Sequence, residues 1–428
     1  MGDTAFTRNR DQPLHRWVPW VAGFSSSFVA GVLEGAAGRE PGEVTVLDPF
    51  AGVGTTLVEA LRRGHRAVGF EINPYAALVS RVKMGAATCD LRRVEELGRQ
   101  FRRFMSSRRR RAPRSAPPPG FRSRVPFFSP RVERQVLHVL DFIGKREDDW
   151  LRDVLRVALG AVLVSVSNYS YEPSLGTRAA AGKEDVLDAD VAGAVAGKLD
   201  QMLDDMRHFQ RQVAAFEPPP RVEVHTDSFL RSADRLPGGS VDFLVTSPPY
   251  LNNYHYIRNT RPHLFWLGLV ARRAELKALE QASFGKFWQT VRSGPEVELA
   301  VECDGLAERL EALRARNPEK GAYGGRGWAN YAATYFNDCL AFCRAARALM
   351  APGGTAVVVI GNNVLQGIEF RTDEYFAEIA QACGFELAGM HRARKTRTGT
   401  SIIRSSVRVG NARERVELYE TAVELLAS

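Results

Sequence analysis

The stretch from Val44 to Gly64 constrains the fold of this chain more than any other. Residues 44–47 form an apolar run typical of a buried strand, residues 48–56 form a loop with two glycines, and residues 57–63 are predicted to be helical. Gly64 then ends the helix. A strand, a tight glycine loop and a helix in this order predict the first half of a βαβ unit.

The loop and the strand after it have the residues of a nucleoside site. Gly52 and Gly54 allow the backbone to approach a ligand closely, and the start of the helix offers free N–H groups to a carboxylate. A second predicted strand ends at Glu71, 23 positions after Asp48. An acid at that place can accept hydrogen bonds from both hydroxyls of a ribose.

The ligand that this loop predicts is not a dinucleotide. Leu57 stands where the pattern G-x-G-x-x-G requires its third glycine, and the loop lacks the lysine of a P-loop. A nucleoside with a short zwitterionic tail fits better than a pyrophosphate. S-adenosylmethionine matches that description and is the predicted cofactor.

A second motif follows the apolar run 241–245 and Thr246. Ser247-Pro248-Pro249-Tyr250 contains two prolines, which cannot donate backbone hydrogen bonds and which force a stiff, extended turn. Free carbonyls then lie beside a hydroxyl and an aromatic ring, a combination suited to a flat ring that carries an amino group. Upstream, Asp227 follows a short strand and could accept a hydrogen bond from an adenine amine or cap a helix.

Strands alternate with helices along most of the chain, which predicts a Rossmann-like α/β fold. We expect a doubly wound, mostly parallel sheet with a helical insertion. The first half of the catalytic domain, with the cofactor loop, is predicted at 1–100, followed by an Arg/Pro-rich linker at 101–124 and the helical insertion at 125–220. The second half of the core, with Ser-Pro-Pro-Tyr, is predicted at 221–268. A possible target-recognition or lid segment follows at 269–328, and C-terminal core elements at 329–428.

Net charge and composition limit the partners. A net charge of +9 favours a polyanion such as nucleic acid. The linker is expected to be flexible, either as a solvated connection or as a basic arm that touches phosphates, and residues 392–408 are also basic. Apolar runs are too short for a membrane span and a signal peptide is missing, so a cytoplasmic protein is expected. Five scattered cysteines complete no zinc pattern, and no metal site is predicted.

With both motifs placed, the sequence resembles the amino-methyltransferases that modify exocyclic amines of DNA bases. Residues 48–55 match the pattern D-P-F-x-G-x-G-T and residues 247–250 match the pattern S-P-P-Y; the resemblance covers roughly residues 15–90 and 221–410. It implies double-stranded DNA with a flipped base as the partner. It assigns cofactor binding to Asp48, Phe50, Gly52, Gly54, Thr55, Glu71, Asp227 and Ser228, and catalysis to Ser247, Pro248, Pro249 and Tyr250.

The expected reaction is direct, in-line methyl transfer. The Ser247 hydroxyl and the Pro248 carbonyl can accept the two amine hydrogens while Tyr250 stacks on the flipped base. None of the five cysteines follows a proline, which argues against the covalent route to C5 of cytosine. Within the family, Ser247 favours cytosine N4; adenine N6, an amine of RNA, and a catalytically silent nucleic-acid-binding module are the alternatives. The recognition sequence, a restriction partner and the oligomeric state cannot be read from the chain.

Overall fold

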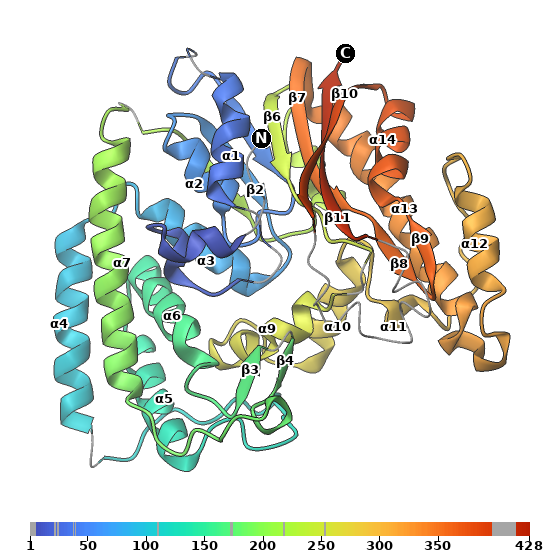
Figure 1. Cartoon of the computed structure of the whole chain (residues 1–428). Helices are drawn as coiled ribbons and strands as arrows, with labels where there is room; N and C mark the ends of the chain where they lie inside the picture. Colours follow the sequence, from blue (N-terminus) through green and yellow to red (C-terminus); the bar gives the residue numbers. More distant parts are fainter. Residues whose placement is uncertain are drawn as a thin grey trace.

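A seven-stranded sheet forms the centre of the computed structural model (Figure 1). Its strands are β1 (Thr45–Asp48), β2 (Arg66–Phe70), β5 (Val222–His225), β6 (Val241–Thr246), β7 (Met350–Gly361), β10 (Phe385–Lys395) and β11 (Tyr419–Ala427). The structure describes residues 6–20, 23, 25–36, 38, 40–108, 111–171, 174–216, 219–251, 254–395 and 417–428.

The strand order is β10-β11-β7-β6-β1-β2-β5. The strands from β7 to β5 run parallel, while β11 is antiparallel to both of its neighbours. This confirms the prediction of a Rossmann-like, mostly parallel α/β sheet. From β1 the chain first winds outward through β2 and β5 and then returns to β6 on the other side. The carboxyl ends of β1 and β6 therefore meet where the winding reverses, the usual ligand site of such sheets.

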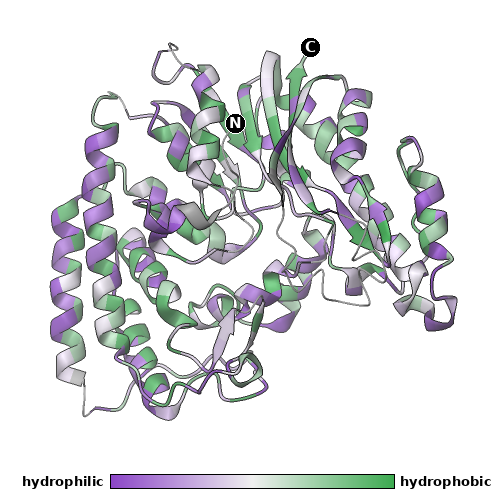
Figure 2. Ribbon diagram, viewed as in Figure 1, coloured by the Kyte–Doolittle hydropathy of each residue, from purple (hydrophilic) through white to green (hydrophobic). Residues whose placement is uncertain are grey.

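Both faces of the sheet are covered by helices because apolar side chains alternate along the strands. Val46 belongs to the core under α1 (Ser26–Leu33), α2 (Thr55–Leu61) and α3 (Pro74–Gly85), whereas Leu47 points into the opposite core. That second core lies under α8 (Phe229–Ser232), α13 (Gly325–Leu349) and α14 (Thr372–Ala382). Figure 1 shows the two helical layers on either side of the strands, and Figure 2 shows that the central strands are mostly hydrophobic.

Four helices form a layer beside α3 and correspond to the predicted insertion and the helix before it. They are α4 (Leu91–Arg108), α5 (Pro130–Ile143), α6 (Asp149–Leu163) and α7 (Val191–Val213). Helix α7 contacts α4, α5 and α6, and α6 contacts α3, so the layer joins the sheet through α3. Among the helices of the described residues, none is long and apolar enough to cross a membrane.

The predicted linker differs from a flexible connection. Its first residues, up to Arg108, continue α4, and residues 111–124 lie against the insertion. Asp141 accepts hydrogen bonds from the backbone N–H groups of Arg114 (2.9 Å) and Ser115 (2.7 Å). The composition, dominated by Arg, Pro and Ser, suggested mobility because such a segment cannot build a core, but Phe121 packs against the ring of Phe265.

Most of the remaining α-helices and strands lie below the carboxyl ends of the sheet strands, but one helix, Leu306–Arg314, lies to the side of them, beyond α14 (Figure 1). These remaining elements are α9 (Tyr256–Trp266), α10 (Arg273–Ala282), α11 (Trp288–Val291), α12 (Leu306–Arg314), and the hairpins β3–β4 (Tyr169–Tyr171 and Leu175–Thr177) and β8–β9 (Asn363–Leu365 and Ile368–Phe370). A hydrogen bond links the insertion to this region: the Tyr171 hydroxyl donates to the Asn259 carbonyl on α9 at 2.9 Å. The predicted basic segment 392–408 lies outside the described residues beyond Lys395.

Candidate active site

A cavity lies at the carboxyl ends of β1, β2, β5 and β6, with about 1010 Å³ of empty space including its open mouth. Two walls can be distinguished by the strands from which they come. We define the β1 wall as the lining residues that follow β1, β2 and β5: Phe50, Gly52, Glu71, Asp227 and Ser228. We define the β6 wall as Ser247, Pro249 and Tyr250, which follow β6, together with His255, Glu280 and Lys286.

Eight of the twelve predicted site residues therefore line one cavity, while Asp48, Gly54, Thr55 and Pro248 lie outside its lining. The chain brings the eight together although more than 190 positions separate the two motifs. Sheet order explains this, because β1 and β6 pair directly with Val46 opposite Phe243.

Gly52 gives the β1 wall its shape. Its φ of 51° is in the left-handed region, and a Cβ there would lie 3.3 Å from Trp20 Nε1. Its N–H donates to Glu71 Oε2 at 2.8 Å, and its carbonyl accepts a hydrogen bond from Ser80 Oγ at 2.8 Å. The loop is thus fixed on both sides, and the glycine keeps the backbone close to any ligand in the cavity.

Glu71 presents a carboxylate at the end of β2. Oε2 accepts the Gly52 N–H, and Oε1 accepts the Asn73 N–H at 2.7 Å. Each oxygen keeps one lone pair for a further donor. Burial raises the pKa of Glu71 to about 7, against the two backbone hydrogen bonds, which lower it. The group can therefore change its charge near neutral pH.

Asp48 ties the two motifs together from beneath the cavity. Its side chain is buried, and Oδ1 accepts the Thr246 hydroxyl at 2.6 Å and the Phe50 N–H at 3.0 Å. Burial raises the pKa of Asp48 to about 6 although both hydrogen bonds oppose the shift. In this structure Asp48 holds the loop after β1 to the last residue of β6, which is a positioning arrangement.

Gly54 and Thr55 shape the loop from its helical end. Gly54 is the residue before α2 and has a φ of 83°, and a Cβ there would lie 3.0 Å from Ser80 Oγ. Thr55 is the first residue of α2 and is buried. The buried ammonium group of Lys83 donates to the Val53 carbonyl at 2.8 Å and holds the same loop from α3.

Asp227 and Ser228 lie beyond β5 at the edge of the β1 wall. Ser228 precedes α8 without a side-chain capping bond, and its N–H donates to Asp227 Oδ1 at 2.7 Å. Asp227 also pairs with Arg231 at 3.3 Å and Arg235 at 3.1 Å. Burial favours the neutral form of Asp227, but the hydrogen bonds from Ser232 and Ser228 and the charge of Arg231 outweigh it and lower the pKa.

The β6 wall begins with the stiff turn of the second motif. The Ser247 hydroxyl donates to the Tyr250 hydroxyl at 3.4 Å, so the two polar groups of the motif meet at the cavity. Pro249 lines the cavity, whereas Pro248 is buried beside it. The two prolines hold Ser247 and Tyr250 in one extended conformation.

Several lining residues could not be assigned from the sequence. His255 Nδ1 accepts the Arg258 N–H at 3.3 Å, and burial lowers the pKa of His255 to about 4. The neutral ring therefore carries its proton on Nε2, which lies 3.4 Å from Glu280 Oε1. The run 251–256 is rich in aromatic and amide residues, but this composition alone does not name a site residue. Trp20, Glu280 and Lys286 had no pattern of their own.

The fold and the cavity define a class of protein: a Rossmann-like α/β protein with a cavity between its glycine loop and a Ser-Pro-Pro-Tyr turn. A family model described as DNA methylase, of the N6/N4 type, matches residues 39–81. That range holds β1, the glycine loop, β2 and most of α3.

Curated relatives match over most of the chain. The type II methyltransferase M.BsoBI of Geobacillus stearothermophilus is 21% identical over 418 residues, covering 89% of this chain and 80% of that protein. The type II methyltransferase M.AvaI of Nostoc sp. is 22% identical over 411 residues, covering 90% and 81%. These matches confirm the resemblance to DNA amino-methyltransferases of the N4/N6 type.

Proposed function

We propose that this protein transfers a methyl group from S-adenosylmethionine to the exocyclic amine of a flipped DNA base, with cytosine N4 as the acceptor. The hydrogen bond from Thr246 to Asp48, 2.6 Å long, carries this proposal, because it joins the glycine loop to the strand that leads into Ser-Pro-Pro-Tyr. Cofactor and acceptor groups thereby line one cavity. The names of the relatives, type II methyltransferases, support methyl transfer but not the choice of cytosine N4, which is proposed from Ser247.

The β1 wall fits the adenosine part of the cofactor. The free lone pairs of Glu71 are proposed to accept both ribose hydroxyls, because the N–H groups of Gly52 and Asn73 orient the carboxylate and leave a lone pair on each oxygen. The rings of Phe50 and Phe229 line the cavity and offer apolar surfaces to the adenine. The Gly52 backbone leaves room for close approach.

Asp227 is proposed to accept the adenine amine. Its four acceptor positions are engaged by Ser228, Ser232, Arg231 and Arg235. Both arginines are exposed. An incoming amine would therefore replace one arginine, which water can solvate, rather than a buried partner.

The bound cofactor supplies a methyl group on a sulfonium; transfer forms the N–C bond, breaks the S–C bond with its electron pair left on sulfur, and releases one amine proton to solvent. The amine is a poor nucleophile because its lone pair is delocalised into the ring. Ser247 Oγ and the Pro248 carbonyl are proposed to accept its hydrogens, drawing the nitrogen toward tetrahedral geometry. Tyr250 is proposed to stack on the flipped base, and this positioning supplies much of the rate.

We propose that segment 269–328 contacts DNA through an aromatic ledge, defined as Trp288, Arg292 and Tyr323. The Arg292 guanidinium lies 4.6 Å from the ring centre of Trp288 and 4.1 Å from that of Tyr323, whose side chain is 60% exposed. Trp288 stacks on Trp328, and Trp328 contacts Tyr331 of the cavity. Stacked rings with an arginine are suited to nucleic-acid bases.

A second basic surface supports the same partner. Arg111, Arg114, Arg122 and Arg124 are exposed on the segment packed against the insertion. Such groups can neutralise phosphates on either side of a flipped nucleotide. We propose this reading of the Arg/Pro-rich segment in preference to a solvated linker.

The test is incubation with S-adenosylmethionine labelled on the methyl group and unmethylated duplex DNA, followed by digestion to nucleosides. Label in N4-methylcytosine is expected. Label only in N6-methyladenine would keep the enzyme class but replace the acceptor base. Label in tRNA or rRNA with none in DNA would overturn the DNA assignment.

A further inference from the structure

The N-terminal segment, residues 9–20, runs from the helical insertion to the cavity. Its last residue, Trp20, lines the cavity, and the indole nitrogen lies beside Gly52. Nothing in the two motifs explains how this segment is held in place. The role inferred for this segment rests on the proposed function, because the segment borders the β1 wall.

Asp205 on α7 anchors the segment, and this residue is only 1% exposed. The carboxylate accepts the Leu14 N–H at 3.0 Å and the Trp17 Nε1–H at 3.0 Å. It also accepts two hydrogen bonds from the Arg16 guanidinium, at 2.6 and 3.1 Å. Burying a carboxylate is costly unless donors surround it, and here all four donors come from the N-terminal segment.

Leu14 shows that the anchor enforces one conformation. Its φ is 66°, in the left-handed region that residues with a side chain avoid. Such strain persists only where the surroundings over-determine the backbone. Here the Leu14 N–H is bound to Asp205, and its side chain is fully buried.

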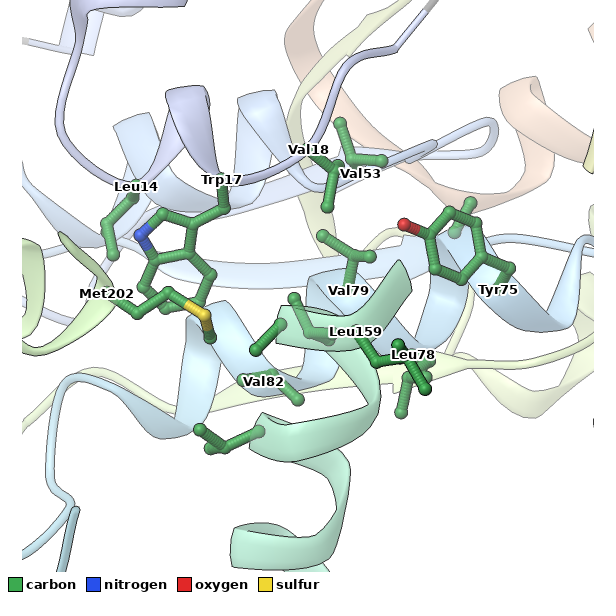
Figure 3. Packing of buried hydrophobic residues seen from close by; sticks show 14 of the residues in the cluster. Leu14, Trp17, Val18, Val53, Tyr75, Leu78, Val79, Val82, Leu159 and Met202 are labelled. Carbon is green, nitrogen blue, oxygen red and sulfur yellow. The ribbon is translucent and has the colours of Figure 1, made fainter. Parts of the chain in front are cut away.

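A second contact fixes the same segment to the core. His15 Nε2 lies 3.0 Å from Glu59 Oε1 on α2, and both side chains are buried. Residues 14–17 are thus held between α2 of the methyltransferase core and α7 of the insertion. Figure 3 shows Trp17 next to Met202 of α7, and Val18 near Val53 of the glycine loop, all within one buried cluster.

We infer that the insertion positions the β1 wall. Asp205 on α7 holds Leu14, Arg16 and Trp17, so that Trp20, three positions after Trp17, stays against the loop that contains Gly52. Asp205 is a positioning residue, because it lies outside the cavity lining and acts through the N-terminal segment. The insertion therefore contributes to binding of S-adenosylmethionine and not only to the DNA side of the molecule.

The test compares Asp205→Asn with Asp200→Asn. Asp200 lies on the same helix and pairs with Arg102 in an exposed ion pair, so it is a matched control. Titration calorimetry with S-adenosylmethionine should show an affinity about tenfold weaker for Asp205→Asn, the loss expected when one buried charged hydrogen bond fails. Asp200→Asn should bind like the wild type, and both variants should keep wild-type affinity for DNA.

A double-mutant cycle separates positioning from general destabilisation. Trp20→Ala should weaken cofactor binding by itself, and adding Asp205→Asn should then cost little more, because Trp20 is the group through which Asp205 acts. Additive losses would mean that Asp205 affects the fold as a whole, and they would overturn the inference.

Two further outcomes are decisive. Folded Asp205→Asn with wild-type cofactor affinity would overturn the inference directly. If that variant does not fold, Arg16→Gln removes the half-exposed partner and should still weaken cofactor binding measurably; wild-type affinity in this variant would refute the anchor. A wild-type protein that does not bind S-adenosylmethionine would instead refute the proposed function, and this inference with it.

Discussion

The two walls of the cavity are built in different ways. The β1 wall comes from the loops after β1, β2 and β5, and its polar groups form hydrogen bonds at short range, as Glu71 does with Gly52 and Asn73. The β6 wall combines one stiff turn with side chains from the residue before α9, from α10 and from the loop at 283–287. Much of its contact is between rings, such as His255 and Phe287, whose centres lie 3.7 Å apart.

This difference matches the two proposed ligands. A cofactor of constant shape is best bound by a wall whose polar groups are already fixed in place. A base that leaves a duplex is better received by aromatic surfaces, because stacking tolerates variation in approach. With the cofactor on the β1 wall and the flipped base on the β6 wall, substitutions in the β1 wall should change cofactor affinity. Substitutions in the β6 wall should change the rate of methyl transfer or DNA binding.

The largest effect is expected for Tyr250→Ala. Losing the stacking surface should reduce the rate of methyl transfer about 100-fold, while affinity for S-adenosylmethionine changes little. Single-turnover transfer and cofactor titration would measure the two quantities. Tyr250→Phe is the matched control, since it keeps the ring and removes only the hydroxyl that meets Ser247. A collapse of cofactor affinity in Tyr250→Ala would show that the walls have been assigned to the wrong ligands.

Glu71→Gln should have the converse effect. Replacing the carboxylate removes the charged acceptor for the ribose hydroxyls and should weaken S-adenosylmethionine binding about tenfold. Calorimetry would measure this loss, and DNA affinity should stay at the wild-type value. If the Glu71→Gln protein lost DNA affinity but bound the cofactor normally, Glu71 would not be a cofactor-binding residue.

Binding of the cofactor should also depend on pH. The raised pKa of Glu71, about 7, means that the carboxylate is charged above this value and protonated below it. Ribose hydroxyls donate to the charged form, so affinity should rise about fivefold from pH 6 to pH 8 and level off above. Glu71→Gln should give a flat profile over this range. The same slope in the variant would place the titrating group elsewhere.

A smaller effect is expected on the outer side of the β6 wall. Tyr323→Ala removes the exposed ring of the aromatic ledge and should weaken DNA binding about threefold without changing cofactor affinity. Fluorescence anisotropy with a labelled duplex would measure this. Leu187→Ala is a suitable control, because Leu187 is also an exposed apolar side chain, at 76%, but lies on the insertion. Equal losses in both variants would argue against a specific role for the ledge.

The fold was predicted correctly from the sequence, and the residues of the β1 wall were named from it, because both depend on local patterns. Alternating strands and helices indicated the sheet, and a glycine loop next to β1 indicated where its ligand lies. Ser247 and Tyr250 were also found through a local motif. Asp48 shows the limit of a local motif: the motif assigned it to the cofactor, but it does not record that the carboxylate accepts a hydrogen bond from Thr246.

The other parts depend on contacts between distant segments, which no local pattern records. Asp200, Asp204 and Asp205 stand on one helix, yet only Asp205 is buried by a segment almost 200 positions away. Phe121 fixes a segment whose composition suggested a flexible linker, because its partner Phe265 follows much later in the chain. His255 and Glu280 likewise meet only after folding.

The most direct test of the central claim is sequencing of modified bases in genomic DNA from cells with this protein, from cells without it, and from cells with Tyr250→Ala. We expect N4-methylcytosine at one recurrent sequence in the first cells, absent from the second and strongly reduced in the third. Identical modification patterns in all three, with the protein folded and present, would contradict it.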